Sequence, residues 1–283
     1  MAVKFIIDSA ADIIPSECEV LGLTHLPLKV LFGDEEFADS VTITHGEFYE
    51  KLTTNPNHPT TRQVSPAEFE SAYERVTASG DEAVVITISS KLSGTYQSAV
   101  IASEDYEGKV FVVDSRNATV GERALLRYGI RLAEEGLSAA EIAAKLDEAK
   151  TRIRLVATVD TLEYLKKGGR ISAATAVVGG LLNIKPAIAV VDGVVETAGK
   201  ARGVKAANAL LRQLVEKSGG VDTSMPLCLA YSGSTDENLQ KFVAEHGDLW
   251  EGIGENLSIS SVGAVIGTHV GPGAVAVAFF GKE

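Results

Sequence analysis

The sequence predicts an α/β protein built from two domains. Through the first half of the chain, short β-branched apolar runs alternate with amphipathic segments, which is typical of parallel strands joined by helices. In the second half, Asp192-Gly193 separates two apolar runs and indicates an antiparallel hairpin. The length of 283 residues is sufficient for two such units.

In the N-terminal half the alternation is regular, and it predicts a parallel, Rossmann-like sheet with helices on both faces. We expect strands at Val3–Ile7, Leu26–Phe32, Ala83–Ile88 and Val110–Val113. Prolines fit the first helical turn, and serine is a favoured N-cap. We therefore expect helices from Pro15, His45 to Leu52, Pro66 to Gly80, Ser93–Ser103, Glu122–Glu135, and from Ser138 to about Arg152, with an extended loop from Asn55 to Pro66.

In the C-terminal half the hairpin interrupts the alternation, so a mixed sheet is expected. The strands are expected at Arg154–Thr158, Ala187–Val191, Val194–Thr197, Leu227–Tyr231, Leu257–Ser261 and Ala274–Phe280. The helices are expected at Thr161–Lys167, Val204–Lys217 and Asp236–His246. The change of pattern predicts an N-terminal α/β domain over residues 1–155 and a C-terminal α/β domain over 156–283, with an approximate boundary and room for interleaving.

Composition narrows the classes of partner. The net charge of −12 argues against nucleic-acid binding and against broad adhesion to anionic lipid. The window from Arg152 to Lys205 carries nine Lys or Arg against four Asp or Glu, and this basic window leaves room for a charged partner or a transient contact with a membrane surface. Cys18 and Cys228 form no metal or disulfide pattern, and no signal peptide or membrane span is recognisable, so a cytoplasmic location is expected.

The segment from Ala83 to Ala99 is the first candidate for a binding site. A strand runs directly into a hydroxyl-rich turn that opens a helix, with Ser90 or Ser93 as the expected N-cap. Such a helix start presents free N–H groups and the positive end of the helix dipole, which suit a phosphate or a carboxylate. An ordinary serine-capped turn has the same pattern, so the residues alone leave both interpretations open.

Further polar loops are expected nearby, because ligands of parallel α/β sheets bind beyond the carboxyl ends of the strands. These loops are Asp8-Ser9, Asp114-Ser115 and Thr60–Ser65. His269 lies in the glycine-rich stretch Gly267–Gly273, which is interpreted as a loop, and Arg202 precedes a helix. Caps and structural hydrogen bonds are the alternative roles of these side chains.

Several functional classes lack their motifs. A P-loop, a dinucleotide glycine fingerprint, a nucleophile elbow and zinc-ligand spacing are all missing from the sequence, so neither cofactor nor metal is expected. One catalytic alternative remains, a serine-type acyl hydrolase or acyltransferase that uses Ser93 and His269, with Asp8 or Asp114 orienting the imidazole. A binder of another amphipathic carboxylate is a third possibility.

Seven segments, in order from one end of the chain to the other, resemble the DegV family. They are Asp8-Ser9 with Asp12, the Thr60–Ser65 loop, Ser89–Ala99, Asp114-Ser115, Thr161–Ile171, Leu182–Pro186 and His269-x-Gly271-Pro272-Gly273. The resemblance implies a two-domain α/β fold that holds one long-chain fatty acid in a tunnel between the domains. It further implies a non-enzymatic role as the lipid-binding subunit of a bacterial fatty acid kinase. A separate ATP-dependent subunit would convert the bound carboxylate to an acyl phosphate for phospholipid synthesis.

The resemblance also assigns residues by position. It implies that Thr61, Ser93, Gly94, Arg202 and His269 bind the carboxylate, and that Lys166, Lys167 and Arg170 face the kinase. The family loop usually reads Thr-Ser-Gln-Pro, whereas this chain has Arg62 and Val64 at the second and fourth positions. The apolar run over 173–182, with Ile184 and Ile188, could line the tunnel or be plain core. Its expected lining residues are Val177, Leu181 and Leu182, together with Ile184 and Ile188.

Overall fold

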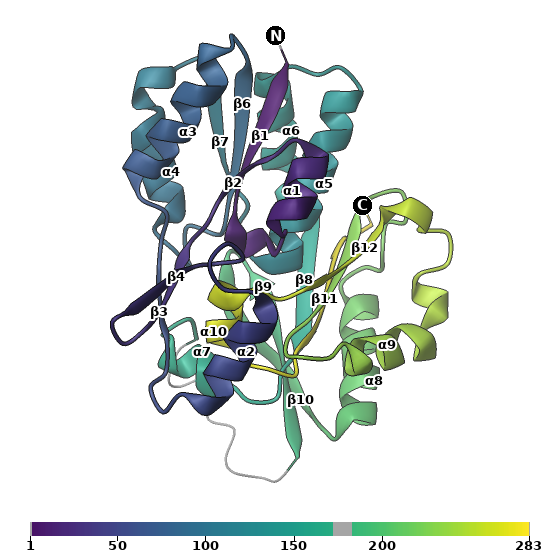
Figure 1. Cartoon of the computed structure of the whole chain (residues 1–283). Coiled ribbons are helices and arrows are strands. Elements are labelled where there is room, and N and C mark those ends of the chain that lie inside the picture. The colour runs from purple at the N-terminus through teal and green to yellow at the C-terminus, as the bar shows by residue number, and fades with distance from the viewer. Residues whose placement is uncertain (1, 172–182, 283) are drawn as a thin grey trace.

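We describe a computed structural model of the chain, which covers residues 2–171 and 183–282 (Figure 1). It contains a four-stranded sheet, a six-stranded sheet and a small three-stranded sheet. The four-stranded sheet lies at the top of Figure 1, and the six-stranded sheet lies below it. The expected α/β fold with one parallel and one mixed sheet is confirmed.

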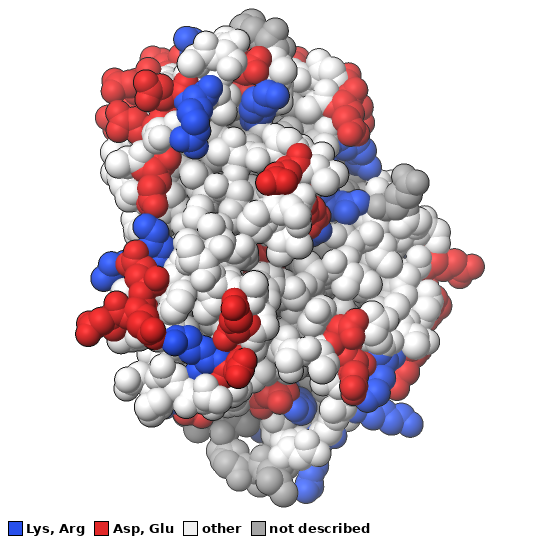
Figure 2. Space-filling view, viewed as in Figure 1, with Lys and Arg blue, Asp and Glu red and all other residues white. Residues whose placement is uncertain are grey.

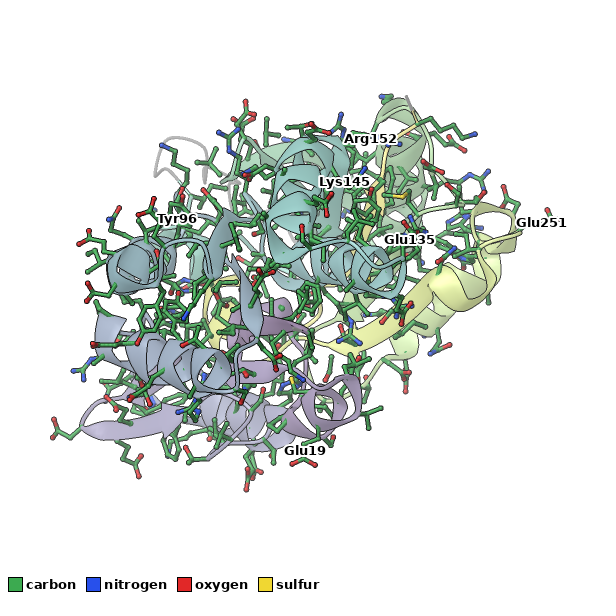
Figure 3. The ribbon with its side chains drawn as sticks, turned by 90° about the horizontal axis from the view of Figure 1, so that it is seen from above. Glu19, Tyr96, Glu135, Lys145, Arg152 and Glu251 are labelled. Carbon is green, nitrogen blue, oxygen red and sulfur yellow. The ribbon has the colours of Figure 1, made fainter. Side chains whose placement is uncertain are left out.

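The four-stranded sheet has the order β2-β1-β6-β7 and is parallel throughout. Its strands are β1 (Val3–Asp8), β2 (Thr24–Leu26), β6 (Glu82–Thr87) and β7 (Val110–Asp114). Its helices are α1 (Pro15–Leu21), α3 (Pro66–Ala78), α4 (Thr95–Ser103), α5 (Thr119–Glu134) and α6 (Ala139–Ala149). Seen from above, Tyr96 on α4 and Lys145 on α6 lie on opposite sides of this sheet (Figure 3).

Local sequence explains how several of these helices begin. Ser65 accepts a hydrogen bond from the amide of Glu68, and the Glu68 carboxylate accepts one from the amide of Ser65. The same reciprocal arrangement joins Ser138 to Glu141 at α6. These capping boxes satisfy amides that the helix itself leaves unpaired, so both helix starts are encoded locally.

A small layer from the N-terminal half packs against the C-terminal half. It consists of β3 (Lys29–Phe32), β4 (Glu35–Ala38) and β5 (Thr60–Arg62) in the order β4-β3-β5, with α2 (His45–Thr54) beside it. Phe48 and Tyr49 of α2 form a buried cluster with Ala264 of α10 (Ala264–Val270). Part of the N-terminal half therefore packs directly on the C-terminal half at this layer.

The six-stranded sheet is mixed, with the order β10-β9-β8-β13-β11-β12. Its strands are β8 (Ile153–Thr158), β9 (Ile184–Val191), β10 (Val194–Arg202), β11 (Leu227–Tyr231), β12 (Leu257–Ser261) and β13 (Val275–Phe280). The remaining helices are α7 (Glu163–Lys167), α8 (Val204–Lys217) and α9 (Glu237–Glu245). The Asp-Gly hairpin is confirmed as the antiparallel pair β9–β10. We propose the domain boundary near residue 155, within β8.

Three expectations about local structure were wrong. The strand expected over Leu26–Phe32 is split between two sheets, because Pro27 has no N–H to donate to a ladder. Helix α4 begins at Thr95 with Gly94 as its N-cap, not with a serine. His269 lies in the last turn of α10 rather than in a loop.

Charge is unevenly distributed over the surface. In Figure 2, acidic side chains gather over α3 and α4 at the upper left of the view.

Within residues 2–171 and 183–282, none of the helices combines the length and the hydrophobicity that a membrane-spanning helix requires.

Candidate ligand-binding site

A cavity with an empty volume of about 1020 Å³, counted out to the solvent at its mouth, lies where the two large sheets and the small layer meet. Most of its wall is apolar and comes from both halves of the chain. The parallel-sheet half contributes Ile88, Leu92 and Ala118. Leu28, which directly precedes β3 of the small layer, lines the same wall. The mixed-sheet half and α10 contribute Leu155, Ala157, Val159, Leu165, Ile188, Val190, Val195, Val262, Val265, Ile266, Val270, Ala274 and Ala276.

Polar side chains enter the cavity wall chiefly from four places. The strand β5 and the residue after it bring Thr61, Arg62 and Gln63, and the start of α4 brings Ser93 and Gly94. Arg170 follows α7, and His269 comes from α10. Thr61 Oγ1 and His269 Nε2 are 3.1 Å apart and share a hydrogen bond. The cavity therefore combines a long apolar wall with a group of hydroxyl, imidazole and guanidinium groups.

Gly94 packs closely against the side chain of Gln63. A Cβ at this position would overlap the side-chain oxygen of Gln63. The Gln63 amide nitrogen donates to Ser98 Oγ at 2.8 Å and to the Gly94 carbonyl at 3.3 Å. Gln63 therefore links the end of β5 to the start of α4, and both segments line the cavity.

His269 is neutral over the ordinary pH range. Burial lowers the pKa of its imidazole to about 3, with smaller contributions from the nearby charges of Arg170 and His58. Its Nδ1 has no hydrogen-bond partner among the residues that the structure describes. The ring packs against Gly168, where a Cβ would overlap Nδ1. A neutral ring that donates from Nε2 to Thr61 leaves the Thr61 hydroxyl proton available to a ligand.

Arg170 supplies positive charge to the same wall. Its Nε donates to the Leu92 carbonyl at 3.1 Å, and its Nη1 donates to the Gly168 carbonyl at 2.7 Å. These two bonds hold the half-buried guanidinium in place. Both acceptors are neutral carbonyl groups, so neither bond neutralises the positive charge of Arg170. An anion in the cavity would be attracted to this fixed charge.

The position of α10 depends on carboxyl groups far away in the sequence. Asp39 accepts hydrogen bonds from the amides of Ala264 (2.8 Å) and Val265 (3.3 Å), and Asp12 accepts one from the amide of Gly263 (2.8 Å). These bonds satisfy the first amides of the helix that carries His269. Sequence reasoning noted Asp12 only as part of a motif and missed Asp39, because neither lies near α10 along the chain.

The structure brings together four of the five residues assigned to the carboxylate, namely Thr61, Ser93, Gly94 and His269. Arg202 is exposed at the end of β10 and is not among the residues that line the cavity. Of the two tunnel residues expected on β9, Ile188 lines the cavity together with Val190, whereas Ile184 pairs with Arg202 in the hairpin and is not among the lining residues. Val177, Leu181 and Leu182 lie outside the described residues.

Of the residues assigned to a kinase contact, Lys166 and Lys167 are exposed on α7, and Lys167 pairs with Glu163 at 2.7 Å. Arg170 is different, because it lines the cavity. This placement was not expected from the sequence, since a basic run after a short helix is usually a solvated surface.

The geometry gives no support to a serine hydrolase. The Ser93 hydroxyl pairs with the Thr95 hydroxyl at 2.9 Å, whereas His269 Nε2 pairs with Thr61. No acidic residue of the described chain accepts a hydrogen bond from His269 Nδ1, so the imidazole lacks the orienting carboxylate of a triad. The described residues also contain no group of three or more His, Cys, Asp or Glu that could hold a metal ion.

Comparisons with known proteins agree with this architecture. A family model for uncharacterised proteins of the DegV family matches residues 2–282. A DegV domain-containing protein of Deinococcus radiodurans is 36% identical over 283 residues, with 98% of each chain covered.

Two solved structures are similar over nearly the whole chain. One, described as the fatty acid binding of a DegV family protein from Thermus thermophilus, has a TM-score of 0.87 and 31% identity and covers 99% of this chain and 100% of its own. The other, a stearic acid-binding protein from Eubacterium ventriosum, has a TM-score of 0.82 and 27% identity, with 98% and 97% covered. The match over 281 consecutive positions, together with the shared fold, shows that this chain belongs to the DegV family.

Proposed function

We propose that this chain binds one long-chain fatty acid in the cavity. The observation that carries the proposal is the composition of the cavity wall, which is apolar over most of its extent and polar around Thr61. Burial of the acyl chain contributes about 0.8 kcal/mol per methylene, so roughly fifteen methylenes contribute about 12 kcal/mol before ordering costs. The tail therefore sets the affinity and the polar groups set the orientation. The fatty acids bound by two related structures support the same ligand class.

The carboxylate is proposed to lie among Thr61, Ser93 and Arg170. His269 accepts no proton over the ordinary pH range. In this proposal its ring proton is on Nε2 and is donated to Thr61, which leaves the Thr61 hydroxyl proton for the carboxylate. Ser93 adds a second hydroxyl, and Arg170 supplies the opposite charge. Ser93 is in this proposal a ligand-holding residue that is never acylated.

We further propose that a separate ATP-dependent kinase subunit phosphorylates the bound carboxylate. A carboxylate oxygen would attack the γ-phosphorus, ADP would leave, and an acyl phosphate would form. The chain contains no P-loop of its own, so the nucleotide would come bound to the partner. The exposed Lys166 and Lys167 on α7, which packs against the helix that carries His269, are the proposed contact.

Native mass spectrometry of the protein purified from cells, followed by organic extraction, tests the first proposal. We expect one additional mass of a fatty acid per chain, and reloading of the delipidated protein with palmitate at the same ratio. A protein that neither carries nor takes up a fatty acid would contradict it. Turnover of a chromogenic ester, lost in Ser93→Ala, would revive the hydrolase.

The kinase proposal needs its own assay. The protein loaded with palmitate is incubated with ATP and a fatty acid kinase catalytic subunit, and acyl phosphate is trapped with hydroxylamine. We expect product only when both proteins are present, and less product with the double variant Lys166→Glu and Lys167→Glu, which should bind palmitate normally. Product from this chain and ATP alone would overturn the two-component arrangement.

A further inference from the structure

The Asp192-Gly193 turn of the β9–β10 hairpin docks on the parallel-sheet half of the chain. Ser89 Oγ donates a hydrogen bond to the Gly193 carbonyl at 2.8 Å. Both residues are buried. A Cβ on Gly193 would lie 2.6 Å from Ser89 Oγ, so a side chain there would push against this hydroxyl. The contact between the two halves is therefore close-packed as well as hydrogen-bonded.

Ser89 also anchors the turn that opens α4. Its carbonyl accepts hydrogen bonds from the amides of Leu92 (2.9 Å) and Ser93 (3.1 Å), and its own amide donates to the Asn117 carbonyl at 2.7 Å. Leu92 and Ser93 line the cavity, whereas Ser89 and Gly193 are not among its lining residues. Ser89 therefore connects the hairpin turn to this part of the cavity wall from behind the wall.

The wall reaches the surface close to this contact. Val195 of β10 follows Gly193 by two residues, and Leu92 follows Ser89 by three. Both line the cavity from opposite halves of the chain, and both are only partly buried. Arg170 Nε, from the C-terminal half, donates to the Leu92 carbonyl at 3.1 Å. The two halves thus meet here along a seam, which we define by Leu92 and Val195, with few hydrogen bonds across it.

At α5 the two halves are joined through buried contacts. Helix α5 packs against β8, β11 and β13 of the mixed sheet. Its Arg123 is buried, and Arg123 Nε donates to Ser258 Oγ of β12 at 3.0 Å. Separation of the halves along α5 would expose apolar surface and a buried guanidinium, which is costly. A movement that opens the seam costs less, because it breaks few hydrogen bonds between groups that already lie near solvent.

We propose that Ser89 and the Asp192-Gly193 turn form a clasp that holds the two halves closed over the acyl chain, and that release of this clasp lets a fatty acid enter or leave. This inference rests on the proposed binding of fatty acids. An acyl chain enclosed by buried side chains such as Ile188 and Leu155 exchanges only when part of the wall moves. Ser89 is thus a positioning residue, which acts on lipid exchange through the hairpin.

The test measures, by stopped flow, the rates at which the delipidated full chain takes up and releases the fluorescent fatty acid cis-parinaric acid. In Ser89→Ala we expect both rates to rise about three- to ten-fold, the range for one hydrogen bond between neutral groups. The dissociation constant should change less than three-fold. The clasp lies outside the cavity wall and stabilises the closed arrangement of free and loaded protein alike, so the two rates should rise together.

Gly193→Ala should break the same contact from the other side, because its Cβ would displace the Ser89 hydroxyl. We expect it to accelerate exchange to a similar extent. Gly80→Ala is the matched control, because Gly80 has a similar φ (78° against 84°) and a Cβ there would have no neighbouring atom within 4 Å. In the Ser89→Ala background, Gly193→Ala should add no more than Gly80→Ala does, since the hydroxyl that it would displace is gone.

Exchange at wild-type rates in both Ser89→Ala and Gly193→Ala would overturn the inference. A raised dissociation constant with an unchanged association rate in Ser89→Ala would also overturn it, because Ser89 would then only support the head-group turn. Thermal denaturation identifies a variant that does not fold, and the other variant then decides the outcome. If the wild type binds neither cis-parinaric acid nor palmitate, the proposed function itself fails.

Discussion

Thr61 and His269 are 208 positions apart in the sequence, yet Thr61 Oγ1 and His269 Nε2 lie 3.1 Å apart and share a hydrogen bond. The bond joins β5, from the small layer, to α10, which is held by carboxyl groups of the N-terminal half. Its position in the cavity wall makes it the natural point at which to test head-group binding.

Replacement of Thr61 by Val should remove a hydrogen bond to the fatty acid carboxylate. Hydrogen bonds to charged groups contribute about 1.5–3 kcal/mol, which corresponds to a loss of affinity of roughly ten- to hundred-fold. Calorimetry with palmitate measures the change. Thr60→Val is the matched control, because Thr60 is the exposed neighbour on the same strand and should bind palmitate normally. Equal affinity in the two variants would show that the carboxylate lies elsewhere.

Gly94→Ala should disturb the same region through packing. The added methyl would overlap Gln63, which would have to release Ser98 and the start of α4. We expect palmitate affinity to fall at least ten-fold with only a modest loss of stability. Gly46→Ala is the control, because a Cβ at Gly46 would have no neighbouring atom within 4 Å. Alanine also stabilises a helix relative to glycine by about 0.5–1 kcal/mol. Unchanged binding in Gly94→Ala would mean that Gln63 does not position the head-group residues.

The imidazole of His269 should remain neutral throughout the ordinary pH range, because burial lowers its pKa to about 3. The neutral imidazole contributes fully to the free energy of unfolding above pH 6.5, the pKa of histidine in the unfolded state. This contribution is lost as the pH falls from 6.5 toward 3. In NMR spectra of the delipidated protein, the chemical shift of the His269 ring proton should stay constant between pH 5 and 8. Its resonance is assigned by its absence from the spectrum of His269→Gln. A titration midpoint near 6.5 would contradict the neutral-donor arrangement.

Glu122 should make the protein less stable as pH rises. Burial, together with the nearby charges of Asp8 and Asp12, raises its pKa well above 4.5, so the folded state holds a proton that the unfolded state releases. The contribution of Glu122 to the free energy of unfolding is complete below pH 4.5. As the pH rises further, this contribution falls by about 1.4 kcal/mol per pH unit until the pKa of Glu122 in the folded state is reached. Denaturation series from pH 5 to 8 should therefore show a shallower decline in Glu122→Gln. Identical slopes would show that Glu122 is ionised in the folded protein.

Ala276→Leu should shorten the space available to the acyl chain. Ala276 pairs with Ala157 across β13 and β8, and both line the cavity. We expect the affinity for stearate to fall at least ten-fold while that for decanoate changes little. Ala206→Leu, on an exposed position of α8, should leave both unchanged. A uniform loss for both acids in Ala276→Leu would indicate general damage to the fold instead.

Much of the fold could be predicted because its signals are local. The capping box of Ser65 with Glu68, the Asp192-Gly193 turn and the apolar strand at Val84 each act within a few residues, and the structure contains all three. The resemblance to the DegV family, now confirmed, pointed in advance to Thr61 and His269, which the structure brings together in the cavity wall.

Helix α10 shows why other parts could not be predicted. Its sequence contains Val265, Ile266 and Gly267, which favour helix poorly, and it has no capping side chain of its own. Asp39 caps it from 225 positions away along the chain. Gly267 is needed there because a Cβ would overlap Phe48 of α2. These contacts exist only after the halves of the chain have come together.

The sequence by itself determined the strand–helix alternation, the hairpin and the hydroxyl groups of the candidate site, because each depends on neighbouring residues. Only the tertiary structure decided that Arg170 lines the cavity and that Arg202 is not among the described residues of its wall. Whether a side chain faces a cavity depends on the packing of elements distant in sequence, and a single sequence does not encode that packing in any local pattern.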